Sequence, residues 1–258
     1  MKRPKANLCV VLCFLVGNCD ATSIVAIRVP GLIVVGMDSA GTFEGRGSSP
    51  QIKPVCKVYQ NGDMFFAVAG FVNDPVTHFN IASVVSAASK KRGSIRVRAE
   101  VALLAVRGRV PKELATLKRV DPDMYAKIVS EERDFVTILF FGLEKGDVVA
   151  TGWGLKVLLS KKGTIGTVPN WRSCPGVDCP NGTYIFLLGE HGAIDQHFAA
   201  GKPIPSVLAD AATFLVQLEI TEKPADVQPP IDVLRLDSNG AVWICRKQEC
   251  PDVRRRSR

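Results

Sequence analysis

Hydrophobic positions in the first seventy residues form short β-branched runs that are separated by turn residues. Each pair of runs flanks a Pro-Gly or Asn-Gly turn, which is the usual signature of a β-hairpin. The first pair covers residues 22–28 and 32–37, and the second covers residues 55–60 and 64–69. The two hairpins predict an antiparallel sheet at the start of the fold.

After the second hairpin the hydrophobic pattern changes to a helical period. Asn73 or Asp74 is the expected cap of the first helix. The expected elements are helices at 75–91, 95–107, 111–130 and 204–221, and strands at 135–143, 148–151, 184–188, 231–236 and 241–245. Residues 161–180 are polar and rich in Gly and Pro, which favours a long loop.

The order of these elements predicts the class of the fold. Hairpins that are segregated from helices favour two sheets between helical layers over a doubly wound parallel sheet. We therefore expect an α+β fold, a four-layer αββα sandwich of two antiparallel sheets between helices. No internal repeat or linker divides the chain, so residues 22–258 are expected to form one domain with a basic C-terminal tail.

Residues 1–21 have the layout of a secretory signal peptide. Three basic residues open the chain, residues 8–16 are apolar, and small residues follow at Gly17, Cys19 and Ala21. The apolar run is too short for a stable membrane anchor; the alternative is a buried first strand of the domain. Removal of a signal peptide predicts a secreted or periplasmic protein. A cut after Ala21 leaves Thr22 first, a cut after Cys19 leaves Asp20 first, and the sequence leaves both open.

The formal net charge of +8 comes partly from basic clusters at the two ends of the chain. Such clusters are usually solvated, and the chain has neither zinc-finger spacing nor the aromatic and basic interleaving of RNA-binding sheets. The sequence therefore predicts no nucleic-acid partner, no metal and no cofactor.

The cysteines beyond the signal peptide indicate disulfide bonds rather than a zinc site. Cys174 and Cys179 bracket one turn-rich segment, and Cys245 and Cys250 bracket another; neither pair has CxxC spacing. Four cysteines allow three pairings, of which we expect the two local ones, with the 161–180 loop stapled by Cys174 and Cys179. Cys56 is expected to be buried and reduced.

Candidate chemistry lies at the ends of the two hairpins. A threonine hydroxyl needs a base, and an α-amino group with a pKa of roughly 7.7 to 8.0 suits that task near neutral pH. A threonine at a new amino terminus carries both groups, so no histidine is required. If the hairpins face each other, Thr22 would be the nucleophile, Lys57 would favour the free amine, and Asp38 would hold Lys57 charged and oriented.

The order of these residues resembles the amino-terminal half of proteasome β-subunits, which are N-terminal-nucleophile (Ntn) hydrolases. In that family the catalytic aspartate follows the catalytic threonine by sixteen residues, as Asp38 follows Thr22. The catalytic lysine precedes an aliphatic–aromatic pair, as Lys57 precedes Val58 and Tyr59.

The same resemblance implies further site residues. Gly70, in Ala69-Gly70, would donate its N–H to the oxyanion hole. Thr42, after Asp38, would pair with the substrate backbone, and Val68 would lie near the floor of the specificity pocket. The chain would then be a divergent exported member of the family.

The second half of the chain departs from the family pattern. Glu190 or His191 stands where the family has a serine, in the segment Leu-Gly-Glu-His-Gly. Asp226 would serve as a supporting aspartate, but the supporting serine is missing. The residue before Thr22 is Ala21, where the family usually has a glycine that the chain itself cleaves.

Two functions of different classes follow from the resemblance. The first is a threonine-type hydrolase that cleaves peptide or other amide bonds through an acyl-enzyme on Thr22. The second is a catalytically silent binding or structural protein with the same fold. Family members form stacked rings, so a homo-oligomer is compatible with either function. The remaining alternative is an unrelated secreted β-rich protein with disulfides.

Overall fold

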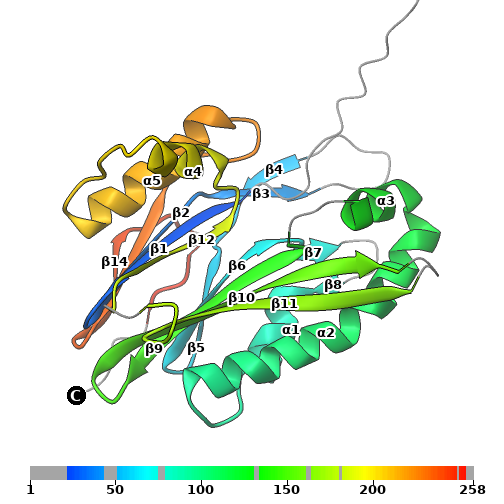
Figure 1. Ribbon diagram of the computed structural model, residues 1–258, viewed down its shortest axis with the longest axis horizontal. Helices are drawn as coiled ribbons and strands as arrows, with labels where there is room; N and C mark the ends of the chain where they lie inside the picture. The colour runs from blue at the N-terminus through cyan, green and yellow to red at the C-terminus, as the bar shows by residue number, and fades with distance from the viewer. Residues whose placement is uncertain are drawn as a thin grey trace, which may run out of the picture.

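Two antiparallel sheets pack face to face between helices and form the centre of the molecule (Figure 1). The computed structural model describes residues 22–43, 51–74, 79–130, 134–160, 164–179, 182–248 and 250–253. The expected signal peptide, residues 1–21, and the basic tail, residues 254–258, lie outside the described residues.

The first sheet has the strand order β12-β1-β2-β13-β14. Its strands are β1 (Ser23–Val29), β2 (Leu32–Met37), β12 (Tyr184–Gly189), β13 (Asp232–Asp237) and β14 (Gly240–Cys245). Side chains alternate between the two faces of β1: Ile24 and Ala26 pack toward the second sheet, whereas Val25 and Ile27 pack beneath helix α5 (Leu208–Glu222). Apolar residues on the two faces of β1 therefore contribute to two cores, one between the sheets and one beneath α5.

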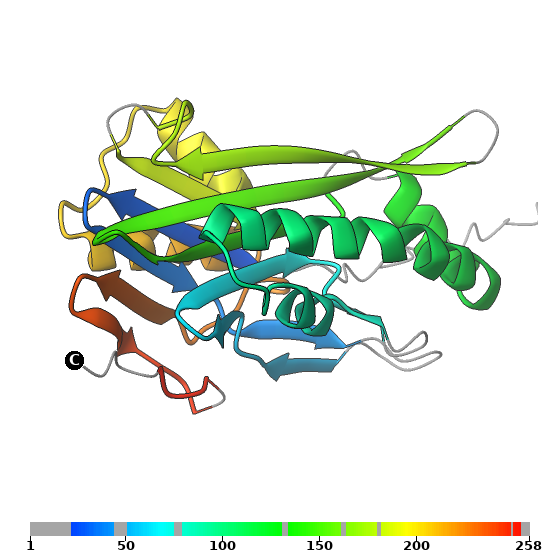
Figure 2. The ribbon, with the colours of Figure 1, turned by 90° about the horizontal axis from the view of Figure 1, so that it is seen from below.

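The second sheet has the strand order β11-β10-β9-β6-β5. Its strands are β5 (Val58–Asn61), β6 (Met64–Gly70), β9 (Val136–Glu144), β10 (Asp147–Leu159) and β11 (Ile165–Cys174). Helices α1 (Ile81–Ala88), α2 (Ile95–Val120) and α3 (Pro122–Ser130) cover its outer face (Figure 2). Phe66, Phe140 and Trp153 fill the core beneath these helices.

Smaller elements complete the fold at the ends of the sheets. β3 (Ala40–Phe43) pairs with β4 (Gln51–Pro54), and β7 (Asn73–Asp74) pairs with β8 (Phe79–Asn80). Helix α4 (Gly192–Ala199) packs against α5 on the outside of the first sheet. The layers are thus helices, sheet, sheet and helices, which confirms the α+β sandwich that the sequence predicts.

Several expected elements differ from the structure. The first helix begins at Ile81, where the Asn80 side chain accepts a hydrogen bond from the Ser83 N–H, so neither Asn73 nor Asp74 is its cap. Helix α2 continues through Pro111, where the sequence predicted a break. Much of the expected 161–180 loop is strand β11, which pairs with β10 along its whole length.

The disulfide pattern also differs from the expected one. Cys174 and Cys179 are bonded as expected, but Cys56 is bonded to Cys250 across 194 positions of the sequence. Cys245 is a free, exposed cysteine. The predictions of a Cys245–Cys250 pair and of a reduced Cys56 are therefore wrong. Two bonded pairs fit a protein outside the reducing cytoplasm.

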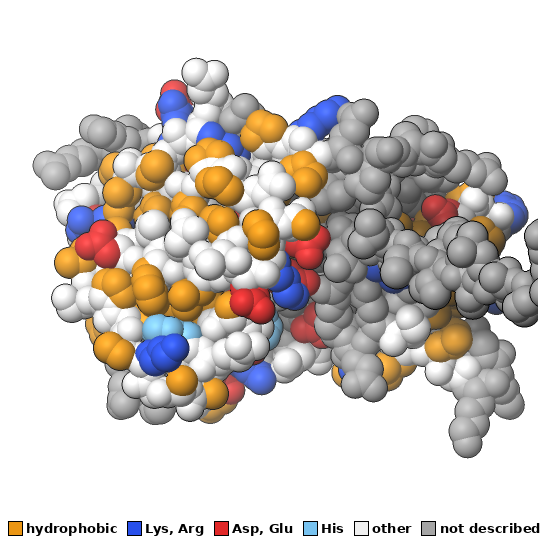
Figure 3. All heavy atoms as spheres, turned by 90° about the horizontal axis from the view of Figure 1, so that it is seen from above, with side chains coloured by type: hydrophobic (Ala, Val, Ile, Leu, Met, Phe, Trp, Pro, Cys, Tyr) orange, Lys and Arg blue, Asp and Glu red, His pale blue; other side chains and the backbone are white. Residues whose placement is uncertain are grey.

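On the face that carries α4 and α5, hydrophobic side chains are interspersed with charged and other polar ones (Figure 3). None of the helices in the described part of the chain is long and apolar enough to cross a membrane.

Candidate active site

Asp38 connects the ends of the two hairpins. It directly follows β2 and is completely buried. One carboxylate oxygen, Oδ1, accepts hydrogen bonds from the Ser23 N–H at 2.8 Å and from the Lys57 ammonium at 2.6 Å. The other oxygen, Oδ2, accepts from the Ala40 N–H at 3.0 Å. Residues 22–23, Asp38 and Lys57 therefore meet at one point.

Lys57 lies in front of β5 with its side chain 5% exposed. Burial lowers the pKa of the Lys57 ammonium from its ordinary value, because an apolar environment disfavours the charged form. The Asp38 carboxylate opposes this shift by attraction and by its hydrogen bond, and the positive charge of Lys247 lowers the pKa further. The pKa of Lys57 is lowered overall.

Thr22 is 7% exposed and lies directly before β1. Its carbonyl oxygen accepts a hydrogen bond from the Glu190 N–H at 2.7 Å. Gly189 closes this contact: it has a φ of 74°, and a Cβ there would lie 2.0 Å from the Thr22 carbonyl oxygen and 3.2 Å from the Ala69 Cβ. The end of β12 thus packs against Thr22, and Ala69 near the end of β6 lies beside Gly189.

The remaining predicted residues lie in different parts of this region. Gly70 ends β6 with a φ of 95° and is half-buried. Thr42 lies on β3, opposite Ile52 of β4, and its side chain is outside the described residues. Val68 packs into the core cluster of the second sheet and the helices that cover it.

The two possible supporting residues flank helices α4 and α5. Glu190 forms an ion pair with Lys223 at the end of α5. Asp226 lies in the turn after α5, where its N–H donates to the Lys223 carbonyl. Within the described part of the chain, the Asp226 carboxylate makes no hydrogen bond to Thr22, Asp38 or Lys57.

Sequence reasoning missed a second buried ion pair beside the first. Lys247 contacts Asp232 and donates to the Ser39 Oγ at 2.9 Å, and Ser39 directly follows Asp38. The Ser39 hydroxyl in turn donates to the Pro230 carbonyl. The local pattern of the sequence predicts only the strand at 231–236, which contains Asp232, and nothing in that pattern pairs Asp232 with Lys247.

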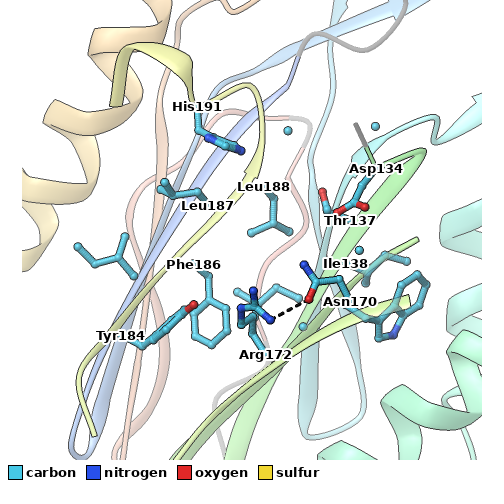
Figure 4. A pocket seen from close by; sticks show the side chains of 17 residues that line it. Asp134, Thr137, Ile138, Asn170, Arg172, Tyr184, Phe186, Leu187, Leu188 and His191 are labelled. Atoms are coloured by element: carbon cyan, nitrogen blue, oxygen red, sulfur yellow. Dashed lines mark hydrogen bonds between the residues drawn. The ribbon is translucent and has the colours of Figure 1, made fainter. Parts of the chain in front are cut away.

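A cavity of about 350 Å³ opens between β12 and the sheet of β9, β10 and β11. In Figure 4, Phe186 and Leu188 of β12 line one wall, and Arg172 of β11 and Ile138 of β9 line the other. Its lining includes Gly70 and Gly189 but not Thr22, Asp38, Lys57 or Val68. The cavity therefore borders Gly189, the residue that packs against Thr22, but none of Thr22, Asp38 and Lys57 lines it.

Charged and polar groups line part of the cavity. The Arg172 guanidinium donates to the Asn170 Oδ1 at 2.7 Å (Figure 4). Burial raises the pKa of the half-buried Asp134 carboxyl, and the positive charge of Lys156 opposes this shift. With its apolar walls and a few polar groups, the cavity has the usual character of a small-molecule or side-chain pocket.

Comparison with known proteins places the fold but gives no sequence family. No protein-family model matches the chain, and no curated protein matches it. Among solved structures, the chain is similar to a Gly-1 mutant of Anbu from Hyphomicrobium sp. strain MC1. The TM-score is 0.50 at 16% sequence identity, and the match covers 88% of this chain and 89% of that one.

These findings correct the expected relationship. The assignment to proteasome β-subunits as a divergent exported member is wrong, because the similarity found is to the solved structure of Anbu, a proteasome-related protein, at only 16% identity. A likeness at that identity shows the fold and says nothing about activity. The chain has a proteasome-like fold.

Proposed function

We propose that this chain is an N-terminal-threonine hydrolase that cleaves peptide or other amide bonds. Thr22 would become the first residue after a cut behind Ala21, and its hydroxyl would attack the substrate carbonyl. In this proposal Thr22 is the reacting group, and Asp38 and Lys57 support it. The Gly70 N–H would donate a hydrogen bond to the oxyanion.

The observation that carries the proposal is the buried Asp38–Lys57 pair directly beside the start of β1. Asp38 accepts from both Lys57 Nζ and the Ser23 N–H, so the pair is fixed relative to the residue that follows Thr22. A buried ion pair contributes little net stability, because desolvation offsets the attraction between the charges. Its burial at this point therefore favours a chemical role over a stabilising one.

The reaction would proceed in two steps. The free α-amine of Thr22 takes the proton of its own hydroxyl, and the oxygen attacks the carbonyl carbon. The tetrahedral oxyanion accepts a hydrogen bond from the Gly70 N–H, the amine of the substrate leaves with the proton, and an ester on Thr22 remains. Water, deprotonated by the same α-amine, then hydrolyses this ester and restores the hydroxyl.

The cavity suggests which substrates fit. It borders Gly70 and Gly189, and its walls carry Phe186, Leu188 and Ile138. Apolar walls favour a bulky apolar side chain next to the scissile amide. We therefore expect hydrolysis of amides with a large apolar residue to exceed that of amides with glycine at the same position.

The second candidate is a silent binding or structural protein with the same fold. It is favoured by the Glu190–Lys223 ion pair beside the Thr22 carbonyl, in a segment where proteasome β-subunits have a serine. In this case the chain would bind its partner without turnover, whether or not Thr22 is the first residue.

A hydrolysis assay separates the two candidates. The protein is prepared with Thr22 as its first residue, by removal of a fusion partner, and assayed with fluorogenic peptide amides. We expect turnover that falls to background in Thr22→Ala and persists in part in Thr22→Ser, whose hydroxyl can react in the same way. Thr221→Ala, on the exposed end of α5, serves as the control and should retain full activity. Absence of turnover with every amide would favour the binding protein.

A further inference from the structure

A second lysine–aspartate pair is buried next to the first. Lys247 and Asp232 are 8% and 0% exposed. The Lys247 ammonium contacts the Asp232 carboxylate, and the Lys247 N–H donates to the Asp232 Oδ1 at 2.7 Å. The proposed reaction does not use this pair.

Ser39 and Met37, the two neighbours of Asp38 in the chain, link the second pair to the first. Lys247 Nζ donates to the Ser39 Oγ at 2.9 Å, and Ser39 is the neighbour of Asp38 in the chain. Asp232 pairs with Met37 in the register of β13 and β2, and Met37 is the other neighbour of Asp38. Asp38 is therefore held on both sides by residues that contact the second pair.

A covalent link connects the segment of Lys247 with the segment of Lys57. Cys250, three residues after Lys247, is bonded to Cys56, the residue before Lys57. The Cys250 N–H donates to the Lys247 carbonyl at 3.3 Å, and the Cys250 sulfur lies 3.6 Å from the Asp232 Oδ2. The disulfide thus joins the segment of Lys57 covalently to the segment of Lys247.

The charges of the two pairs also act on each other. The groups that act on the Lys57 ammonium are Asp38 at the end of β2, Asp232 at the start of β13 and Lys247 after β14. The Lys247 charge lowers the pKa of Lys57, and the Asp232 charge raises it. Two cations and two anions therefore form one buried, electrically neutral cluster.

We propose that Lys247 is a positioning residue of the candidate site, which holds Asp38 and Lys57 in their relative geometry through Ser39 and Asp232. The Cys56–Cys250 disulfide fixes the segment that carries Lys247. The inference rests on the proposed function for its effect on catalysis, but its effect on Lys57 is independent of substrate.

The test uses the chain that begins at Thr22 and four variants. Lys247→Met removes the positive charge, and Lys247→Arg keeps it. Lys247→Met/Asp232→Asn removes both charges and avoids a buried, unpaired carboxylate. Arg98→Met is the matched control, because Arg98 is also 8% exposed and paired with Asp63, but at the far end of β5 from Lys57.

The first measurement is the titration of Lys57 by NMR of lysine labelled with ¹³C at Cε. Lys247→Met should raise the pKa of Lys57, because a neighbouring cation is lost and Asp232 stays charged. Lys247→Arg and Arg98→Met should leave the pKa of Lys57 close to that of the parent protein. An unchanged Lys57 titration in folded Lys247→Met would overturn the proposal.

The second measurement is the rate of amide hydrolysis by the same proteins. The double variant should lose about tenfold to a hundredfold in kcat with little change in KM, because a small displacement of reacting groups costs that much. Lys247→Arg should recover most of the loss, and Arg98→Met should show none. Full kcat in the double variant would overturn the proposal. If the parent protein itself shows no turnover, the hydrolase function fails, and the Lys57 titration still decides the role of Lys247.

Discussion

Asp38 satisfies three donors from three parts of the chain: Ser23 on β1, Ala40 on β3 and Lys57 before β5. The carboxylate uses both of its oxygens for these contacts. The local geometry of the candidate site therefore depends on this one side chain.

Asp38→Asn should destabilise the protein by about 3 to 5 kcal/mol, because it leaves the Lys57 charge buried without its counterion. Asp38→Asn/Lys57→Met should recover most of this stability, since no buried charge remains, but it should stay inactive. Urea denaturation of the two variants and an amide hydrolysis assay measure both effects. A single variant as stable as the parent would contradict the account of this pair.

The lowered pKa of Lys57 predicts the alkaline side of the activity profile. If charged Lys57 assists Thr22, kcat/KM should fall as the pH rises through the pKa of Lys57, which lies below the ordinary 10.5. Stability should move in the opposite direction. Native Lys57 loses its proton at a lower pH than Lys57 in the unfolded chain. Burial of the Lys57 charge therefore lowers the free energy of unfolding at lower pH, and this destabilisation is relieved as the pH rises from the native pKa to 10.5. Lys57→Arg stays charged and should lack this decline in a pH–rate profile.

At the scale of elements, the junction of β12 and α4 closes against the start of β1. Gly189 has a positive φ, and a Cβ there would overlap the Thr22 carbonyl oxygen. Gly201, after α4, also has a positive φ of 63°, but a Cβ there meets nothing within 4 Å. A substitution at Gly201 therefore adds backbone strain alone, whereas a substitution at Gly189 adds backbone strain and steric overlap.

Gly189→Ala should cost clearly more stability than Gly201→Ala. Gly201→Ala carries only the left-handed backbone penalty of about 1 kcal/mol. Gly189→Ala must also displace Thr22, so we expect a total of about 3 kcal/mol or more, in the range of severe substitutions, and loss of activity. Thermal unfolding of the two variants gives the comparison, and equal destabilisation would show that Thr22 does not pack against Gly189.

The hairpins and most helices could be predicted because local patterns determine them. β-branched runs around Asn61-Gly62 and Pro30-Gly31 gave β1, β2, β5 and β6 within a few residues. Helix α2 was wrongly divided at Pro111, because burial of Val106, Val110 and Leu114 on one face outweighs the local cost of proline. β11 was missed because its Gly and Pro content hides a strand that pairing with β10 stabilises.

The candidate site could be predicted only where its residues lie on adjacent hairpins. Asp38 and Lys57 meet because the end of β2 lies beside the start of β5. Lys247 contacts Ser39 across 208 positions of the sequence, and no local pattern encodes such a pairing. The Cys56–Cys250 bond was missed for the same reason, because spacing favoured the nearest cysteine.

At the scale of the molecule, the two disulfides have different consequences. Cys56–Cys250 closes almost the whole described chain, whereas Cys174–Cys179 closes one turn after β11. Loop-closure entropy predicts a stabilisation of about 5 kcal/mol for the long loop and about 2 kcal/mol for the short one. Cys56→Ser/Cys250→Ser should therefore unfold at lower urea than Cys174→Ser/Cys179→Ser.

The same pair of variants separates stability from activity. Loss of the Cys56–Cys250 bond should also lower the rate of amide hydrolysis, because this bond joins the segments of Lys57 and Lys247. Loss of the short disulfide should leave the rate per folded molecule unchanged. Equal effects of the two variants on both stability and rate would contradict this description of the molecule.

The proteasome-like fold by itself does not decide whether the chain is an enzyme. The similarity to Anbu extends over 88% of the chain at 16% identity, so the layers are shared while most side chains differ. Function therefore has to be argued from the site, where the free α-amine of Thr22 is the central requirement.

The most direct measurement compares two chains that differ by one residue: one begins at Thr22, and the other begins at Ala21. Each is incubated with an activated amide or β-lactone, and its intact mass is measured, followed by peptide mapping. We predict one acyl adduct on Thr22 in the first chain and none in the second, in which an amide bond blocks the Thr22 nitrogen. Equal acylation of the two chains, or none in either, would contradict the claim that Thr22 reacts through its own α-amine.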